Sequence, residues 1–289
     1  MTSRIFEWHP AKLLQAKECS PDFALLVLNQ PLKNSNDLRR LWNNASLRVA
    51  ADGGANRLHD LSSFRAKFVN FPLLIRRSLL WCPSTTSSNP TLQSNLQAIV
   101  GDLDSLAPSV KDFYCSQPTP TQVIHDPGQQ STDFGKAIEW IRQKHPEGLD
   151  IVALGGLGGR VDQGLSQLHH LYVFQPGPDY SKGCIYLLSG SSLTFLLKTG
   201  KHRIQVREDG EDGVFGKYVG IIPLQEPSFI STKGLRWDVS NWETKMGGQL
   251  STSNHVQPDA KIVEVETTSD VLFTIALRRF DGEDDGRAE

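Results

Sequence analysis

The sequence predicts an α/β domain with an open, mostly parallel sheet in Rossmann-like layers, followed by an all-β sandwich. In the first part of the chain, short and almost wholly apolar runs alternate with helix-like stretches, which is typical of parallel strands buried on both faces. In the second part the helical pattern disappears, and strand candidates follow one another with Gly, Pro, Ser and Asn between them. The segment PGPDYSKG (176–183) separates the two patterns.

The α/β domain is predicted to span residues 20–180. Its clearest helix runs from Ser131 to Lys144, because apolar residues repeat there at helical spacing and Ser131 or Thr132 can cap its start. A second helix is predicted after Asp162. In such a domain, ligands bind at the carboxyl ends of the strands. The predicted strands are FALLVLN (23–29), LRVAA (47–51), AIVGD (98–102), TQVIH (121–125) and DIVALG (150–155).

The β-sandwich is predicted to span residues 183–280, and an acidic tail follows at 281–289. Its strand candidates are CIYLLSG, SLTFLLK, HRIQV, YVGIIPL, FISTKGL, KIVEVET and VLFTIAL. A segment at about 70–95 fits neither pattern, because its second part is rich in Ser, Thr, Asn and Pro and has no steady period. We interpret it as an insertion, either a lineage-specific loop or a translated intron.

Composition excludes several classes of protein. The chain has 289 residues, 38% of them hydrophobic and 21% charged, which is the range of ordinary globular proteins. Thirty Lys and Arg against 32 Asp and Glu give a formal charge of −2, so we expect no nucleic-acid partner. No apolar run approaches the length of a membrane span, and the four cysteines are dispersed without any CxxC pair. We therefore expect a cytoplasmic protein with no membrane partner.

Acidic motifs stand at or just after the predicted strand ends and helix starts. Taken singly, each has an ordinary structural explanation, such as a turn or a charge that complements a helix dipole. Together, carboxylates at one edge of a sheet would repel one another unless cations lay among them, and Mg²⁺ prefers such oxygen ligands. The five candidates are Asp52, Asp102, Asp104, Asp133 and Asp162.

A glycine-rich segment, GGLGGR, lies just before Asp162. Gly158 and Gly159 offer backbone amides without side-chain bulk, and Arg160 offers a guanidinium group, so both suit phosphate oxygens. The chain lacks the P-loop pattern GxxxxGK[ST]. It also lacks the dinucleotide pattern GxGxxG, because Val161 occupies the third glycine position.

These motifs, in this order, resemble the thiamin pyrophosphokinase (thiamine diphosphokinase) family of eukaryotic type. The α/β part carries ADGGANRL, GDLDS, the QxxTDFxK pattern of Gln129 to Lys136, and LGGLGGRVDQ. The second part carries GLRW (234–237) and GGQLSTSN (247–254). The matches extend over about Phe23 to Leu277, nearly the whole chain, and the combination of motifs is specific.

The resemblance implies an enzyme that transfers the diphosphate of ATP to the hydroxyl of thiamin, giving thiamin diphosphate and AMP. It implies a homodimer with active sites between subunits. By similarity the five carboxylates surround Mg²⁺ and the triphosphate, with Asp102, Asp104 and Asp133 as metal ligands. The resemblance also places Gln129, Thr132, Gly158, Gly159 and Arg160 around the nucleotide.

For thiamin, the resemblance implies a pocket in the β-domain. Trp237 would stack on the pyrimidine ring, and Ser251, Ser253 and Asn254 would line the same pocket. From the residues alone, Trp237 is better explained as a core residue of the β-domain. His169 and His170 are adjacent on a predicted helix and therefore point different ways, so we interpret them as core or surface residues rather than metal ligands.

Two departures from the family pattern stand out. Leu96-Gln97 replaces a common Pro-Asp before the GDLDS strand, and Gln130 replaces an acid before the STD motif. Asp133 and Asp102 are both candidates for the general base. Two alternatives stay open: a related phosphotransferase that accepts another alcohol, and a catalytically silent protein that binds or senses thiamin.

Overall fold

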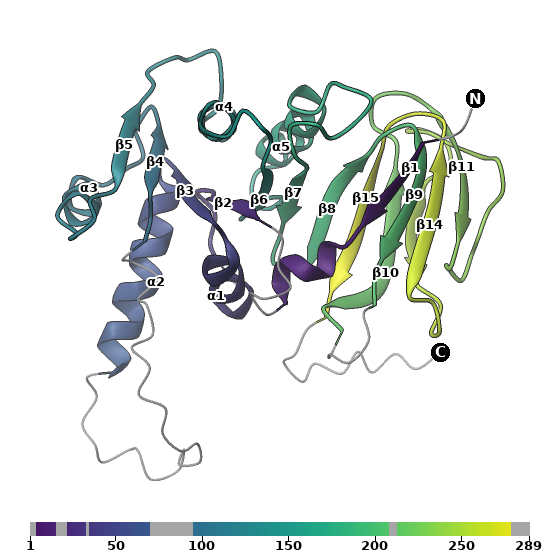
Figure 1. The fold of residues 1–289 in the computed structure, drawn as a ribbon, viewed down its shortest axis with the longest axis horizontal. Coiled ribbons are helices and arrows are strands. Elements are labelled where there is room, and N and C mark those ends of the chain that lie inside the picture. Colours follow the sequence, from purple (N-terminus) through teal and green to yellow (C-terminus); the bar gives the residue numbers. More distant parts are fainter. Residues whose placement is uncertain (1–3, 16–21, 33–34, 70–94, 208–212, 279–289) are drawn as a thin grey trace, which may run out of the picture.

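The computed structural model describes residues 4–15, 22–32, 35–69, 95–207 and 213–278 (Figure 1). The predicted insertion at about 70–95 lies outside the described residues except for its last position. The predicted acidic tail at 281–289 also lies outside them. The described residues form two sheets, one of ten strands and one of five, with helices against part of the larger sheet.

Six neighbouring strands of the larger sheet are parallel and form the predicted α/β sheet. Their order is β7-β6-β2-β3-β4-β5. Most of their side chains are buried, as expected for strands covered on both faces. The strands are β2 (Phe23–Val27), β3 (Leu47–Ala51), β4 (Ala98–Gly101), β5 (Gln122–His125), β6 (Asp150–Leu154) and β7 (Ile185–Leu188).

Helices cover both faces of this parallel sheet. Buried side chains of α1 (Ser35–Asn44), α2 (Gly54–Val69) and α3 (Pro108–Cys115) share one apolar cluster with Phe23, Leu25 and Val27 of β2. Those of α4 (Asp133–Lys144) and α5 (Val161–Val173) share the other cluster with Ala24 and Leu26. The predicted α4 is confirmed, with Thr132 as its cap. No described helix is both long and apolar enough to cross a membrane.

The remaining strands form the predicted β-sandwich. Antiparallel strands β8 (Ser192–Leu197), β15 (Val271–Leu277), β10 (Phe215–Ile222) and β13 (Ser251–His255) extend the larger sheet beyond β7. Phe195 and Phe273 of this layer share a buried cluster with Ile204 and Val263 of the second sheet. The second sheet has the order β1 (Ile5–Trp8), β9 (Gly200–Gln205), β14 (Ile262–Thr267), β11 (Ser228–Lys233), β12 (Trp242–Thr244).

Several features of the fold were not predicted, among them the strands β12 and β13. The N-terminal strand β1 pairs in parallel with β9, and the short 3-10 helix η1 (Pro10–Leu14) follows it. In addition, the larger sheet is continuous from β5 to β13, because β7 pairs with β6 on one side and with β8 on the other. The predicted domain limits at 180 and 183 therefore fall within one sheet, just before β7, and they stay predictions.

Candidate active site

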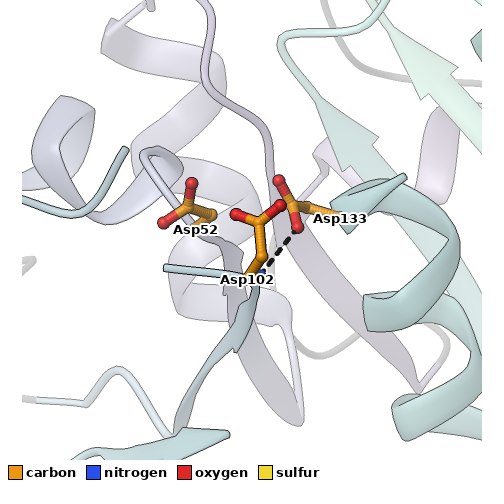
Figure 2. A group of neighbouring side chains, drawn as sticks. All are labelled: Asp52, Asp102 and Asp133. Carbon is orange, nitrogen blue, oxygen red and sulfur yellow. Dashed lines mark hydrogen bonds between the residues drawn. The ribbon is translucent and has the colours of Figure 1, made fainter. Parts of the chain in front are cut away.

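Three of the five predicted carboxylates lie together where strands of the parallel sheet end. Asp52 follows β3, Asp102 follows β4, and Asp133 is the first residue of α4. One oxygen from each lies within 4.8 Å of the others, and Figure 2 shows the three side chains converging. Adjacent parallel strands end at the same edge of a sheet, so the chain positions that carry Asp52 and Asp102 become neighbours in space.

Gly101 allows this close approach. A Cβ atom at this position would lie 2.8 Å from Asp133 Oδ1 and 2.8 Å from Asp52 Cβ, which is closer than carbon atoms pack. The backbone N–H of Asp102 donates a hydrogen bond to Asp133 Oδ1 at 3.1 Å (Figure 2). A side chain at Gly101 would therefore displace Asp52 or Asp133 from the cluster.

Asp52 lies in an environment that is unfavourable for an ionised carboxylate. It is 2% exposed and has a left-handed backbone with φ of 41°. Ser105 N–H donates to Oδ2 at 3.0 Å, but Oδ1 is buried and has no hydrogen-bond partner among the described residues. Burial raises the pKa of Asp52, and the charges of Asp133 and Asp102 add to this effect. A cation at this point would satisfy the oxygen and offset the repulsion.

Lys136 was missed as a site residue by the sequence analysis. Its side chain is only 1% exposed, and Nζ lies 3.6 Å from Asp133 Oδ1 and 3.8 Å from Asp102 Oδ2. In the sequence, Lys136 could have been identified as a site residue only from its place in the QxxTDFxK pattern, one helical turn after Asp133. Three carboxylates and one ammonium group leave a formal charge of −2, which matches one divalent cation.

The start of α4 is fixed by Thr132, which was predicted to lie near the nucleotide. Thr132 Oγ1 accepts a hydrogen bond from Gly135 N–H at 3.2 Å, so the threonine caps the helix that carries Asp133 and Lys136. Gln129 is exposed in the preceding loop, and its Nε2 donates to Pro127 O at 3.4 Å. Among the hydrogen bonds of the described residues, none joins the Gln129 side chain to the three carboxylates.

The structure places the other two predicted carboxylates outside this cluster. Asp104 is exposed, and its N–H donates to Asp102 Oδ1 at 3.2 Å. Asp162 pairs with Arg160 through two hydrogen bonds of 3.1 and 2.5 Å. The Arg160 bond is the main reason why the pKa of Asp162 is lowered. Both side chains of this pair are largely exposed, so the contact contributes little to stability.

The glycine-rich segment forms the turn between β6 and α5. Leu157 N–H donates to Gln167 Oε1 at 2.7 Å, which anchors the turn to the helix that follows it. Gly159 has φ of 74°, a left-handed conformation that favours glycine. A Cβ at Gly158 would meet no atom within 4 Å, so the space beside this residue is open. This turn therefore presents its backbone to solvent.

The predicted thiamin residues lie together in the β-sandwich. Asn254 is buried and makes two bonds to the backbone of Trp237: Oδ1 accepts from Trp237 N–H at 3.1 Å, and Nδ2 donates to Trp237 O at 2.9 Å. Trp237 itself is 54% exposed, and the Arg236 guanidinium carbon lies 5.1 Å from the centre of its ring. Ser251 and Ser253 belong to the same strand as Asn254. Asn254 therefore fixes the backbone of Trp237, while the indole ring stays exposed.

These two groups lie far apart within one chain. In the order of the larger sheet, β13, which carries Asn254, is the first strand and β4, which precedes Asp102, is the ninth. Eight strand spacings correspond to roughly 38 Å along the sheet. Figure 1 shows β4 and β5 toward one end of the molecule, the sandwich at the other, and α4 between β4 and α5. A single small substrate cannot contact both groups of one chain.

Comparison with known protein families and sequences gives a consistent result. A model of the thiamin pyrophosphokinase catalytic domain matches residues 38–179, and a model of the thiamin pyrophosphokinase vitamin B1 binding domain matches residues 201–272. Thiamine pyrophosphokinase 1 of Arabidopsis thaliana is 38% identical over 266 residues, covering 89% of this chain and 87% of that protein. Thiamine pyrophosphokinase 3 of Oryza sativa subsp. japonica is 35% identical over 265 residues, with coverages of 89% and 87%.

Solved structures show the same fold. The crystal structure of yeast thiamin pyrophosphokinase superposes with a TM-score of 0.74 at 23% identity, covering 96% of this chain and 93% of that chain. Thiamin pyrophosphokinase from Candida albicans gives a TM-score of 0.72 at 24% identity, with coverages of 96% and 94%. The two family models and the plant relatives together span most of the sequence, so the chain belongs to the thiamin pyrophosphokinase family.

Proposed function

We propose that this chain carries out its thiamine diphosphokinase activity at the cluster of Asp52, Asp102 and Asp133, with ATP and Mg²⁺ as the donor complex. The observation that carries this proposal is Oδ1 of Asp52, which is buried, has no hydrogen-bond partner in the described part of the chain, and converges with the carboxylates of Asp102 and Asp133. Such an arrangement is costly for a protein without a cation and is what a divalent metal requires.

The donor set fits Mg²⁺. All three side chains offer carboxylate oxygens. The side chains of Asp102 and Asp133 are 22% and 30% exposed, so phosphate oxygens and water, which Mg²⁺ commonly keeps as ligands, can reach the cluster. When bound, the ion neutralises phosphate charge and so makes the phosphorus a better electrophile. Lys136 contributes a second positive charge from within the protein. Asp104 stays a predicted metal ligand that would have to reach the ion through water or a loop movement.

The reaction needs alignment more than strong acid or base chemistry. The hydroxyl oxygen of thiamin bonds to the β-phosphorus of ATP, and the bond from that phosphorus to the bridging oxygen of AMP breaks. The hydroxyl proton passes to a carboxylate, for which Asp133 and Asp102 are the candidates. In phosphoryl transfer most of the rate enhancement comes from positioning and charge stabilisation, which suits a site built of carboxylates and cations.

The glycine-rich turn is proposed to hold the triphosphate. Gly158 and Gly159 expose backbone N–H groups without side-chain bulk, at the start of α5, where the helix dipole favours an anion. Arg160 is exposed, and within the described ranges its ion pair is with the exposed Asp162, so it can turn to a phosphate at little cost. Gln129 and Thr132 stay predicted neighbours of the nucleotide at the start of α4.

Thiamin is proposed to bind on Trp237, with Ser251, Ser253 and Asn254 beside it. Because these residues and the carboxylates lie roughly 38 Å apart along the sheet of one chain, the proposal requires a homodimer in which one subunit supplies the carboxylates and its partner supplies Trp237. Exposed apolar side chains on α5 support a partner subunit that covers this helix. Val161 is 78% exposed and Leu165 is 57% exposed. A cytoplasmic location stays a prediction from composition.

The direct test is release of AMP from ATP, with and without thiamin. Thiamin-dependent AMP release that stops when Mg²⁺ is chelated supports the proposal. A protein that releases AMP only with another alcohol would be the related phosphotransferase, and one that binds thiamin without releasing AMP would be the silent binding protein. Asp133→Asn is the matched inactive control. It keeps the shape of the side chain and the hydrogen bond from Asp102 N–H, and it removes only the charge that the proposal assigns to metal binding.

A further inference from the structure

His170 contacts Thr132, the cap of α4, although its pairing with His169 in sequence gave no reason to assign it to the site. His170 lies in α5, and its Nε2 is 3.2 Å from Thr132 Oγ1. Its other ring nitrogen, Nδ1, is 2.5 Å from the carbonyl oxygen of Ser166. A carbonyl oxygen only accepts, so Nδ1 carries the proton and the neutral ring presents a lone pair at Nε2.

The direction of each hydrogen bond at Thr132 follows from this tautomer. The threonine O–H donates to His170 Nε2, and a lone pair of the same oxygen accepts from Gly135 N–H at 3.2 Å. The hydroxyl group has one proton, so this proton is committed to His170 and cannot turn toward a phosphate. Burial lowers the pKa of His170, which keeps the ring neutral at physiological pH.

The ring of His170 fits a space built for it. A Cβ at Gly135 would lie 3.1 Å from Nε2, so the glycine in the first turn of α4 makes room for the imidazole. The ring stacks on Phe174 with centroids 5.6 Å apart and an interplanar angle of 21°. Phe134 approaches on another side, at 5.3 Å. The imidazole is therefore fixed in position by both helices.

We infer that His170 is a positioning residue for diphosphate transfer: it orients the Thr132 hydroxyl and thereby fixes the start of α4, which carries Asp133 and Lys136, against α5. This inference rests on the proposed placement of the reaction at the carboxylate cluster. His170 lies in the last turn of α5, so its contact with Thr132 joins the start of α4 to the end of the helix whose start carries Arg160 and Asp162.

The test compares two substitutions of similar size. His170→Gln keeps an acceptor oxygen near the position of Nε2, whereas His170→Leu fills the same space without any acceptor. A net hydrogen bond of this kind corresponds to about a fivefold effect. We expect His170→Leu to lower kcat about fivefold with little change in the KM for thiamin, and His170→Gln to restore most of that loss. Equal losses in both variants would overturn the inference.

A double-mutant cycle separates positioning from general packing. In a Thr132→Val background, which lacks the hydroxyl, His170→Leu should lower kcat by less than about twofold, because the contact is already gone. If the kcat of the double variant fell by the product of the losses in the two single variants, His170 would act only through packing, and the inference would be contradicted. Asp102→Asn, assayed alongside, distinguishes the proposals: if it stays active, the placement of the reaction fails, whatever the His170 variants do.

Discussion

Asp52 shows at the residue scale how the site is built at the expense of stability. Its left-handed backbone, its burial and its unpartnered oxygen each cost free energy, and its neighbours Asp102 and Asp133 carry the same charge. Asparagine adopts the left-handed region more readily than most residues and has no charge. At this position, a residue chosen for stability alone would be asparagine.

We therefore predict that Asp52→Asn abolishes diphosphate transfer and stabilises the metal-free protein. Because the pKa of Asp52 is raised in the folded state, the wild-type protein loses stability as pH rises above the unfolded value, near 4, and this residue ionises while buried. The variant should gain about 1–2 kcal/mol in EDTA at pH 7.5, measured by urea unfolding, and gain nothing at pH 3.5. A variant less stable than wild type at pH 7.5 would contradict this explanation of the raised pKa.

Lys136 supplies the internal counter-charge of the cluster. In Lys136→Met the carboxylates lose their buried cation, so their mutual repulsion increases and the formal charge of the group falls from −2 to −3. We expect a lower Tm without metal and a larger rise in Tm on addition of Mg²⁺ than wild type shows. Thermal unfolding with and without Mg²⁺ measures both. If Mg²⁺ raised the Tm of both proteins equally, Lys136 would not be coupled to the metal.

Sequence reasoning found the carboxylates but not their neighbours. Asp52, Asp102 and Asp133 could be predicted because strand ends and helix starts bring such positions to one edge of a sheet. Lys136 could not, because a lysine in a first helical turn is normally solvated, and only the packed structure shows it 1% exposed. The role of His170 could not be predicted either, because its contact with Thr132 joins residues that are 38 positions apart in the sequence.

At the scale of elements, β1 is joined to the sandwich by a buried polar contact. Trp8 Nε1–H donates to His202 Nδ1 at 3.0 Å, so Nε2 carries the proton and donates to Lys198 O at 2.7 Å. Both ring nitrogens are therefore used by the neutral form. This N-terminal strand could not be predicted, because IFEW has only four residues and its partner β9 begins nearly 200 positions later in the chain.

This contact predicts a dependence of stability on pH. Burial lowers the pKa of His202 from 6.5 to about 4, so the unfolded chain binds the proton more tightly than the folded chain. Stability is fully present above pH 6.5 and is lost as pH falls toward 4, by about 3 kcal/mol in total. Urea unfolding between pH 7 and 4 should show this loss in wild type. His202→Gln keeps a donor and an acceptor but takes up no proton, so a loss of the same size in that variant would contradict the assignment.

At the scale of the whole molecule, one continuous sheet separates the two halves of the proposed site. The sequence predicted a parallel sheet and a β-sandwich, yet it placed a boundary at 180–183, just before β7. Because β7 is apolar and follows a turn-rich segment, it resembles the first strand of a new domain, and only its pairing with β6 places it in the parallel sheet. The distance between Asp102 and Trp237 follows from that continuity.

Trp237→Ala should weaken thiamin binding without affecting ATP. A cation against an indole face contributes ~0.5–2 kcal/mol beyond the area it buries, and loss of that contact together with the apolar area predicts a rise of about tenfold in the KM for thiamin. The KM for ATP should change by less than about twofold, because in the proposed site Trp237 contacts thiamin, whereas the carboxylates and the glycine-rich turn hold the triphosphate. Steady-state kinetics with each substrate varied in turn measures both values. A matching rise in the KM for ATP would argue against separate binding surfaces.

The measurement that tests the composite site most directly uses two kinds of heterodimer, prepared by co-expression with different affinity tags and purified through both. One pairs an Asp102→Asn chain with a Trp237→Ala chain, and the other pairs a wild-type chain with a chain that carries both substitutions. If each site takes its carboxylates from one subunit and its tryptophan from the other, the first heterodimer has one intact site and about half of the wild-type activity at the wild-type KM for thiamin, whereas the second has no intact site and shows only the raised KM of the Trp237→Ala variant. If each subunit holds a complete site, the result reverses, with the wild-type KM in the second heterodimer and only the raised KM in the first. A wild-type KM for thiamin in the first heterodimer alone is what this structure predicts, and a wild-type KM in the second alone would contradict it.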